Sequence, residues 1–169
     1  SHFRDFVAHE RHPARLAALA DTPGPRHLDP EFEMAAATFH RFALEQVRPH
    51  AEHVHRANAD IPESIIEGLA ELGGFGLSVP EEFGGFATGS ESDYLAMVVA
   101  TEELSWGSLG IGGSLITRPE IMARALLSGG TPAQRAHWLP RLAQGTSLAA
   151  IAVTEPDFGS DVAGITTSA

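Results

Sequence analysis

A polar segment near the end of the chain has the residue types that bind a large ligand rich in hydrogen-bond acceptors. It reads Thr154-Glu155-Pro156-Asp157-Phe158-Gly159-Ser160-Asp161. Two hydroxyl donors lie beside backbone N–H groups, a proline fixes one φ angle, and a glycine lets a ligand approach the backbone closely. These donors suit a planar heterocycle with carbonyl and ring-nitrogen acceptors, followed by a pyrophosphate. Taken alone, Thr154 and Ser160 would instead be turn and cap residues.

The residues directly before this segment favour a buried strand that would deliver it to the ligand. Ile151-Ala152-Val153 is short, apolar and partly β-branched, as is typical of such strands. No β character is expected before Gly145, so the strand would be the first of a β domain that follows a helical one.

Helical spacing of apolar residues predicts the elements upstream. Helices are expected from Phe3 to Ala20 with a break at Pro13, from Pro30 through Val47, from Pro62 to Leu72, from Ser90 to Trp106, from Leu115 to Leu127 around Pro119, and from Thr131 to Gly145. Residues 22–25, Thr-Pro-Gly-Pro, predict a short linker, and residues 75–90 predict a loop with 77–79 extended.

Capping residues and apolar faces support these boundaries. Asp29 is an N-cap candidate, Thr131 with Gln134 forms a capping-box pattern, and Gly73 and Gly145 are expected to end helices. The faces expected to be buried are Phe32, Ala35, Ala36, Phe39, Phe42, Ala43 and Val47; Ile65, Ile66, Leu69 and Leu72; and Tyr94, Leu95, Val98 and Val99.

Composition excludes several classes of function. A length of 169 residues with 43% hydrophobic residues fits one folded domain, and eleven basic against twenty-two acidic side chains give a formal net charge of −11. This charge opposes binding to nucleic acid or to anionic membranes. No cysteine and no apolar run of membrane-spanning length occur, so we expect a protein of a reducing compartment, the cytoplasm.

Two further groups of residues have a chemical and a structural interpretation. Glu102 and Glu103 are paired acids, but on a helix they point about 100° apart, which favours a surface acid and a helix-end acid. His50, His53 and His55 could form a metal cluster, but solvated histidines at a helix end fit better, so no metal site is predicted.

The polar segment resembles the flavin-binding signature of the acyl-CoA dehydrogenases. Three other stretches that resemble the same family occur upstream in the family's order: Pro80-Glu81-Glu82-Phe83-Gly84-Gly85, then Glu102-Glu103-Leu104-Ser105, then residues 130–134 with 138–145. Because four motifs occur in the family's order over residues 31–169, ligand binding by Thr154 and Ser160 is favoured over a role as turn and cap residues. The resemblance implies a mainly α fold of the family's N-terminal helical type, FAD as cofactor and an acyl-CoA thioester as substrate.

The resemblance also implies domain limits and site residues. Residues 1–28 would be an N-terminal extension and linker, 29–145 the helical domain, and 146–169 the incomplete beginning of a β domain. The residues implied to bind FAD are Ile151, Val153, Thr154, Gly159 and Ser160, with Ser160 also reaching the acyl-CoA. The family's catalytic glutamate base lies on a later helical bundle, so no residue of this chain is assigned that role. The complete protein would be a homo-oligomer in fatty acid metabolism.

The resemblance leaves some alternatives open. Residues 111–117 would line the acyl chain's path, where Gly112 and Gly113 either leave room for it or allow two helices to approach. Asp157 and Phe158 stand where two small residues are common, so a bulky ring and a charge are expected near the pyrophosphate or the acyl entrance. A flavin oxidase on the same scaffold, or a helical subunit without catalytic activity that needs a partner chain, would share these motifs.

Overall fold

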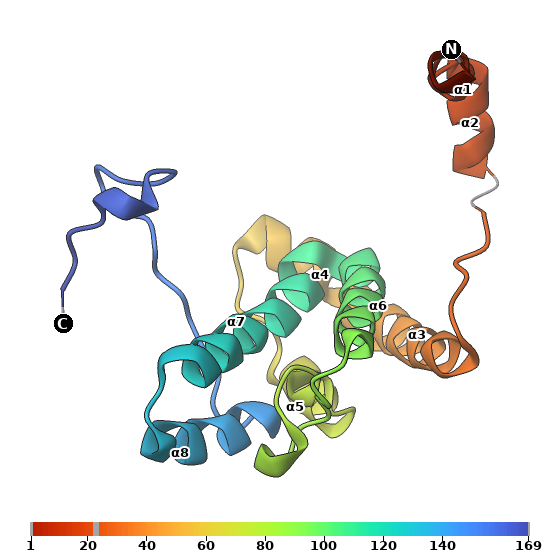
Figure 1. The fold of residues 1–169 in the computed structure, drawn as a ribbon. Helices are drawn as coiled ribbons and strands as arrows, with labels where there is room; N and C mark the ends of the chain where they lie inside the picture. The colour runs from red at the N-terminus through yellow and green to blue at the C-terminus, as the bar shows by residue number, and fades with distance from the viewer. Residues whose placement is uncertain (1, 22–23, 169) are drawn as a thin grey trace. The chain divides into compact units, whose positions relative to one another are not determined.

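The computed structural model describes residues 2–21 and 24–168, and its elements are helices joined by short loops (Figure 1). Internal contacts divide the chain into two units, Ser1–Pro30 and Glu31–Ala169. The first unit contains α1 (His2–Glu10) and α2 (Pro13–Asp21). The expected break before Pro13 is confirmed, since proline suits the first turn of a helix but not its interior. Of the expected linker, residues 22 and 23 lie outside the described part.

The second unit begins with a helix that extends beyond the end predicted from the spacing of its apolar residues. α3 (Pro30–Phe42) continues through a π-helical turn, η1 (Ala43–Val47), into α4 (Arg48–Ala57). The helix ends at Asn58, whose φ of 49° is left-handed, a conformation that asparagine tolerates at helix ends. The sequence pattern ended at Val47 because α4 has no buried residue to mark it.

A short helix and a tight loop follow. α5 (Glu63–Glu71) ends as expected at the Gly73 position, where φ is 74°. The predicted loop contains two 3-10 turns, η2 (Gly74–Gly76) and η3 (Glu81–Phe83), and an isolated bridge between Pro80 and Ala87.

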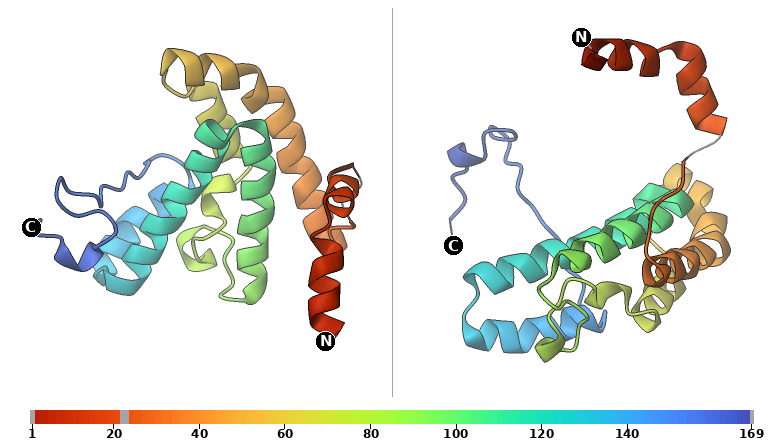
Figure 2. Two further views of the ribbon diagram at one scale, coloured as in Figure 1. Left: turned by 90° about the horizontal axis from the view of Figure 1, so that it is seen from above. Right: turned by 45° about the vertical axis from the view of Figure 1, so that its right-hand side comes forward.

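Three helices complete the unit. α6 (Glu91–Ser108) runs through a π-helical turn, η4 (Leu109–Gly113), into α7 (Ser114–Gly129), and α8 (Pro132–Ala143) returns along α7. Figure 2 shows this pairing of α7 with α8 from two other directions. The capping box of α8 is confirmed: the Gln134 N–H donates to the Thr131 hydroxyl, and the Thr131 N–H donates to the Gln134 side chain.

The core is apolar and lies where the helices meet. Its larger cluster joins α3, α5, α6 and α7, and the most deeply buried side chains in it include Val47, Ile65, Leu69, Phe75, Leu104, Ile111 and Ile116. A smaller cluster joins Val79 to α7 and α8 through Ala123, Leu139 and Ala143. The predicted inner face of α3 is confirmed at Phe32, Ala36 and Phe39.

The predicted inner face of α6 is wrong for most of its residues. Val99 is 1% exposed, but Tyr94 is 58% exposed, and Leu95 and Val98 are exposed as well. The buried residues of α6 are instead Val99, Ala100, Glu103, Leu104 and Gly107. Apolar residues occur on both sides of this helix, so their spacing alone does not identify the packed side. Leu72, expected to point inward from α5, is also exposed.

Candidate functional site

The segment that carries the predicted ligand contacts has no regular strand. The described residues contain no β-strand, so the strand expected over residues 151–153 does not form here. Ile151 is 42% exposed, and Val153 is exposed too. A strand is stabilised by hydrogen bonds to a neighbouring strand, and no described residue provides such a neighbour. This corrects the prediction that these residues are a buried strand in this chain.

The loop after Thr154 is closed by its own backbone. The Glu155 N–H donates to the Phe158 carbonyl at 2.9 Å, and the Phe158 N–H donates back to the Glu155 carbonyl at 3.3 Å. A short 3-10 turn, η5 (Val162–Gly164), follows the loop. These bonds turn the chain sharply around Pro156 and Asp157, as expected from the fixed φ of proline.

The Glu155 side chain ties this loop to the residues after η5. One carboxylate oxygen accepts from the Thr166 N–H at 3.0 Å and from its hydroxyl at 3.1 Å. The other accepts from the Thr167 N–H at 2.7 Å and from the Thr167 hydroxyl. These bonds, above all the one from the Thr167 hydroxyl, lower the pKa of Glu155 from its ordinary value of 4.5 to about 2. No pattern in the sequence indicated that Glu155 would bond to these two threonines.

The bulky ring in the loop is held by the loop itself. A Cβ built on Gly164 would lie 2.5 Å from the Phe158 ring, so this ring packs against the glycine backbone. Asp157 is exposed. Gly159 differs from Gly164, because only the Thr154 methyl group comes within 4 Å of a Cβ built there, at 3.8 Å. The space in front of Gly159 is therefore open to a ligand.

The two predicted hydroxyl donors are exposed beside this open glycine. The Thr154 and Ser160 hydroxyls make no hydrogen bond to any other residue in the described part of the chain, and the Val153 backbone has no partner there. Such donors can serve ligand acceptors without first breaking a protein hydrogen bond. The loop thus brings Thr154 and Gly159 together and leaves their hydrogen-bond donors available to the acceptors of a ligand.

The paired acids of α6 form no acidic pair that faces a ligand. Glu103 is buried, at 7% exposed, and its Oε2 lies 2.7 Å from Nδ1 of His40 on α3. The expectation of a surface acid and a helix-end acid is therefore wrong for Glu103. The His40 ring packs on Trp106, 4.4 Å between centroids, and Arg48 lies 4.5 Å from the same Trp106 ring. These contacts join α3, α4 and α6. They could not be predicted from local sequence patterns, because the residues that make them are far apart in the sequence.

The glycines of residues 111–117 serve helix packing. A Cβ on Gly112 would lie 2.5 Å from the Leu104 carbonyl oxygen, and one on Gly113 would lie 2.7 Å from the Ser105 hydroxyl oxygen. That hydroxyl is buried without a hydrogen-bond partner. Both glycines are needed for η4 to lie against α6, so they leave no empty space between these two elements. Of the two interpretations, close approach of the elements is the one that the contacts support.

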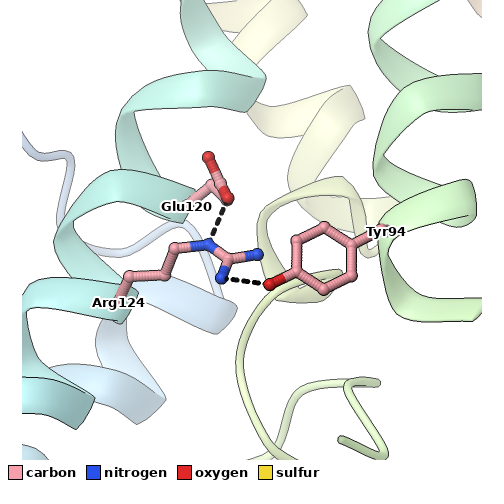
Figure 3. Close-up of polar contacts among 3 residues, drawn as sticks. All are labelled: Tyr94, Glu120 and Arg124. Carbon is pink, nitrogen blue, oxygen red and sulfur yellow. Dashed lines mark hydrogen bonds and ion pairs between the residues drawn. The ribbon is translucent and has the colours of Figure 1, made fainter. Parts of the chain in front are cut away.

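A further polar cluster was not anticipated from the sequence. Arg124 of α7 donates through Nη1 to the Tyr94 hydroxyl at 2.8 Å, donates through Nε to Glu120, and lies 4.6 Å from the centre of the Tyr94 ring (Figure 3). The bonds to Glu120 and Tyr94 raise the pKa of Arg124. Beside Tyr94 and Arg124 is a pocket of about 350 Å³ between α6, α7 and the 77–90 loop. The cluster fastens the start of α6 to the middle of α7.

No metal centre or membrane span is found in the described part of the chain. Among residues 2–21 and 24–168, no three histidine, aspartate or glutamate side chains are grouped as they would be around a metal ion. None of the helices there combines the length and the apolar composition that a bilayer crossing requires.

Comparison with known proteins gives the family. Residues 29–146 match the family model for the acyl-CoA dehydrogenase N-terminal domain, which is well over half of the chain. The chain belongs to the acyl-CoA dehydrogenase family. It is 49% identical over 162 residues to (2S)-methylsuccinyl-CoA dehydrogenase of Cereibacter sphaeroides, an alignment that covers 92% of this chain and 29% of that protein.

Solved structures of family members have the same fold. A glutaryl-CoA dehydrogenase from Mycobacterium smegmatis in complex with FADH2 aligns with a TM-score of 0.73 at 29% identity, over 88% of this chain and 36% of that one. A glutaryl-coenzyme A dehydrogenase in complex with glutaryl-CoA aligns with a TM-score of 0.71 at 29% identity, over 85% and 36%. The chain therefore spans about a third of the length of these acyl-CoA dehydrogenases and corresponds to their N-terminal domain.

Proposed function

We propose that this chain is the N-terminal part of an FAD-dependent acyl-CoA dehydrogenase, which oxidises an acyl-CoA thioester between its α and β carbons. The observation that carries the proposal is the loop at Thr154, where two unpartnered hydroxyls flank an open glycine in a chain of this family.

The proposed organisation follows the family's order of domains. Residues 1–28 are an extension, 29–145 the helical domain, and 146–169 the beginning of a β domain. In the complete protein, residues 151–153 become a strand when neighbouring strands pair with them. Their exposed apolar side chains support this, because a β domain would bury them.

The proposed flavin contacts are those of the loop and the residues before it. The backbone of Ile151 and Val153 and the Thr154 hydroxyl would bind the flavin ring, and Gly159 and Ser160 would bind the rest of the cofactor. When bound, FAD supplies a hydride acceptor at its N5 atom. The donor set fits this group, since all of its members are exposed and none is used in a bond to another described side chain.

The residues of this chain would act by binding and polarisation. The Thr154 N–H and hydroxyl would donate to flavin acceptors and hold the ring, and the Ser160 hydroxyl would donate to the acyl-CoA. Fixed donors of this kind stabilise negative charge that develops in the transition state without reorganising. We assign the base that removes the α proton to none of the described residues, because the family resemblance puts it on a later helical bundle and Glu103 bonds to His40 inside the helical domain.

The names of the relatives suggest which thioester to try first. The relative at 49% identity is a (2S)-methylsuccinyl-CoA dehydrogenase, and two similar structures are glutaryl-CoA dehydrogenases. All three names contain the thioester of a short dicarboxylic acid. We therefore propose the CoA thioester of a short dicarboxylic acid as the substrate, and a homo-oligomer as the complete protein.

Anaerobic reduction of the flavin tests this function. The complete protein, loaded with FAD, is mixed with (2S)-methylsuccinyl-CoA, glutaryl-CoA, isovaleryl-CoA or palmitoyl-CoA, and the flavin absorption band is followed. We expect rapid bleaching with the first and slower or no bleaching with the straight long chain. Failure of every thioester to bleach the flavin would refute the proposal. Rapid reoxidation of the reduced protein by oxygen would instead identify a flavin oxidase.

A further inference from the structure

Glu155 makes the densest set of hydrogen bonds at the candidate site. Both of its carboxylate oxygens accept two bonds, from the N–H and the hydroxyl of Thr166 and from the N–H and the hydroxyl of Thr167. Four donors from two consecutive residues converge on one side chain. Such charge-assisted bonds are stronger than neutral ones, so this contact is the main polar link between the two ends of the loop.

The contact closes the segment that contains the proposed ligand contacts. The four bonds join positions that are eleven and twelve residues apart in the chain, and Gly159 and Ser160 lie between them. Thr154 is the residue directly before Glu155. Moving the Glu155 backbone relative to Thr166 would therefore move Thr154 on one side and Ser160 on the other.

The backbone alone holds this geometry weakly. Within the loop, the mutual bonds of Glu155 and Phe158 and the 3-10 bonds of residues 161–165 are local, spanning three residues each. No residue from 150 to 168 is buried, so packing in an apolar core does not fix the loop. The Phe158 ring packs on the Gly164 backbone. The bonds of the Glu155 side chain to Thr166 and Thr167 are therefore the contacts that join the two ends of the loop.

We propose that Glu155 is a positioning residue, which holds Thr154 and Ser160 in the arrangement that binds the flavin. This inference rests on the proposed function, since Glu155 would act on the residues that bind the cofactor and not on the cofactor itself. A carboxylate is required because four donors need two oxygens with free lone pairs. Glutamine would place its NH2 group against the N–H and hydroxyl of one threonine and lose up to half of the bonds.

The test compares two isosteric substitutions in the complete protein. Glu155→Gln removes a charge from the link, and Glu71→Gln removes the same charge at the end of α5, where the exposed carboxylate makes no hydrogen bond or ion pair with another described residue. We expect Glu155→Gln to raise the FAD dissociation constant about tenfold, the size of one or two lost bonds to a charged group. At saturating FAD, we also expect a shift of the flavin's visible bands and reduction potential, which a purely structural role would leave unchanged. Glu71→Gln should change neither the FAD dissociation constant nor the flavin bands.

A double-mutant cycle identifies the partner. Thr167→Val removes one donor to Glu155, and its effect on FAD affinity should largely disappear in the Glu155→Gln background, because both changes break the same contact. Far-UV circular dichroism checks that every variant keeps its helices. Additive effects of the two substitutions would overturn the proposed link.

The outcomes separate this inference from the proposed function. If Thr154→Val and Ser160→Ala weaken FAD binding while Glu155→Gln behaves like Glu71→Gln, the positioning role is wrong and the flavin contact stands. If Thr154→Val and Ser160→Ala leave FAD binding unchanged, the flavin contact itself is wrong, and the positioning role falls with it. Weaker FAD binding by Glu155→Gln, with a spectral shift that Glu71→Gln lacks, supports both the positioning role and the flavin contact.

Discussion

The helical part of the chain and the loop after it are stabilised in different ways. Residues 31–147 pack around fully buried side chains such as Leu69, Leu104 and Ile116. None of residues 150–168 is buried, and this segment is held by turns and by the four hydrogen bonds to Glu155. Apolar burial supplies most of the free energy of folding, whereas exposed hydrogen bonds add little net stability.

The difference separates the residues that maintain the fold from those that meet the ligand. Substitutions in the helical part should lower the free energy of unfolding, and substitutions in the loop should change ligand binding while the fold stays intact. Loops carried by a rigid domain commonly have this division of roles. The predictions below apply matched substitutions to the two regions.

The largest difference is expected from truncating an apolar side chain. Leu104→Ala empties a fully buried position and should lower the free energy of unfolding by about 2–5 kcal/mol. Ile151→Ala, at a half-exposed position in the loop segment, should change it by less than about 0.5 kcal/mol. Urea denaturation followed by far-UV circular dichroism measures both. Equal losses would show that the loop segment shares the core.

Two glycines give the next contrast. Gly145 has a φ of 69°, and a Cβ there would lie 2.6 Å from the Phe75 ring. Gly145→Ala should therefore cost about 1–3 kcal/mol of unfolding free energy. Gly159 has open space, so Gly159→Ala should leave thermal unfolding unchanged but weaken FAD binding by the complete protein. A melting temperature lowered as much by Gly159→Ala would contradict this account.

Two threonines that donate or accept hydrogen bonds give a smaller contrast. Thr131→Ala removes the capping box of α8 and should cost about 1 kcal/mol. Thr166→Ala removes a hydroxyl bond to Glu155 but keeps the backbone bond, so the unfolding free energy should change by less than about 0.5 kcal/mol. Chemical denaturation compares the two variants. A larger loss from Thr166→Ala would place the loop's hydrogen bonds among the determinants of the fold.

The smallest effect is a local dependence on pH. The pKa of Glu155 is lowered from 4.5 to about 2, so its bonds are fully present above pH 4.5 and are lost as the pH falls toward 2. The amide chemical shifts of Thr166 and Thr167 should stay constant from pH 7 to about 4 and then move together with a midpoint near 2. A midpoint near the ordinary value would mean that the carboxylate bonds do not form in solution.

Local signals in the sequence predicted the helical framework well. Pro13, the Thr131 and Gln134 pair and the helix ends at Gly73 and Gly145 act over three or four residues, within reach of capping and φ preferences. The buried face of α3 followed from its spacing for the same reason. In α6, apolar residues surround the helix, and only the contacts with its neighbours decide which of them are buried.

Contacts between distant residues could not be predicted from one sequence. His40 and Glu103 are 63 positions apart, and Tyr94 and Arg124 are 30 apart. The bonds from Glu155 to Thr166 and Thr167 span only a dozen residues, yet no spacing rule for a loop indicates them. The residues of the candidate site were named from a family resemblance, and their role in binding FAD stays a prediction.

Titration of FAD into the complete protein tests the central claim, that the loop at Thr154 contacts the flavin, most directly. Thr154→Val and Ser160→Ala together should raise the FAD dissociation constant at least about tenfold through two lost hydrogen bonds, with unchanged far-UV circular dichroism. Thr146→Val, a matched loss of a hydroxyl that bonds to the Arg141 carbonyl at the end of α8, should leave the dissociation constant unchanged. FAD binding by the double variant as tight as in the unmodified protein would contradict the account.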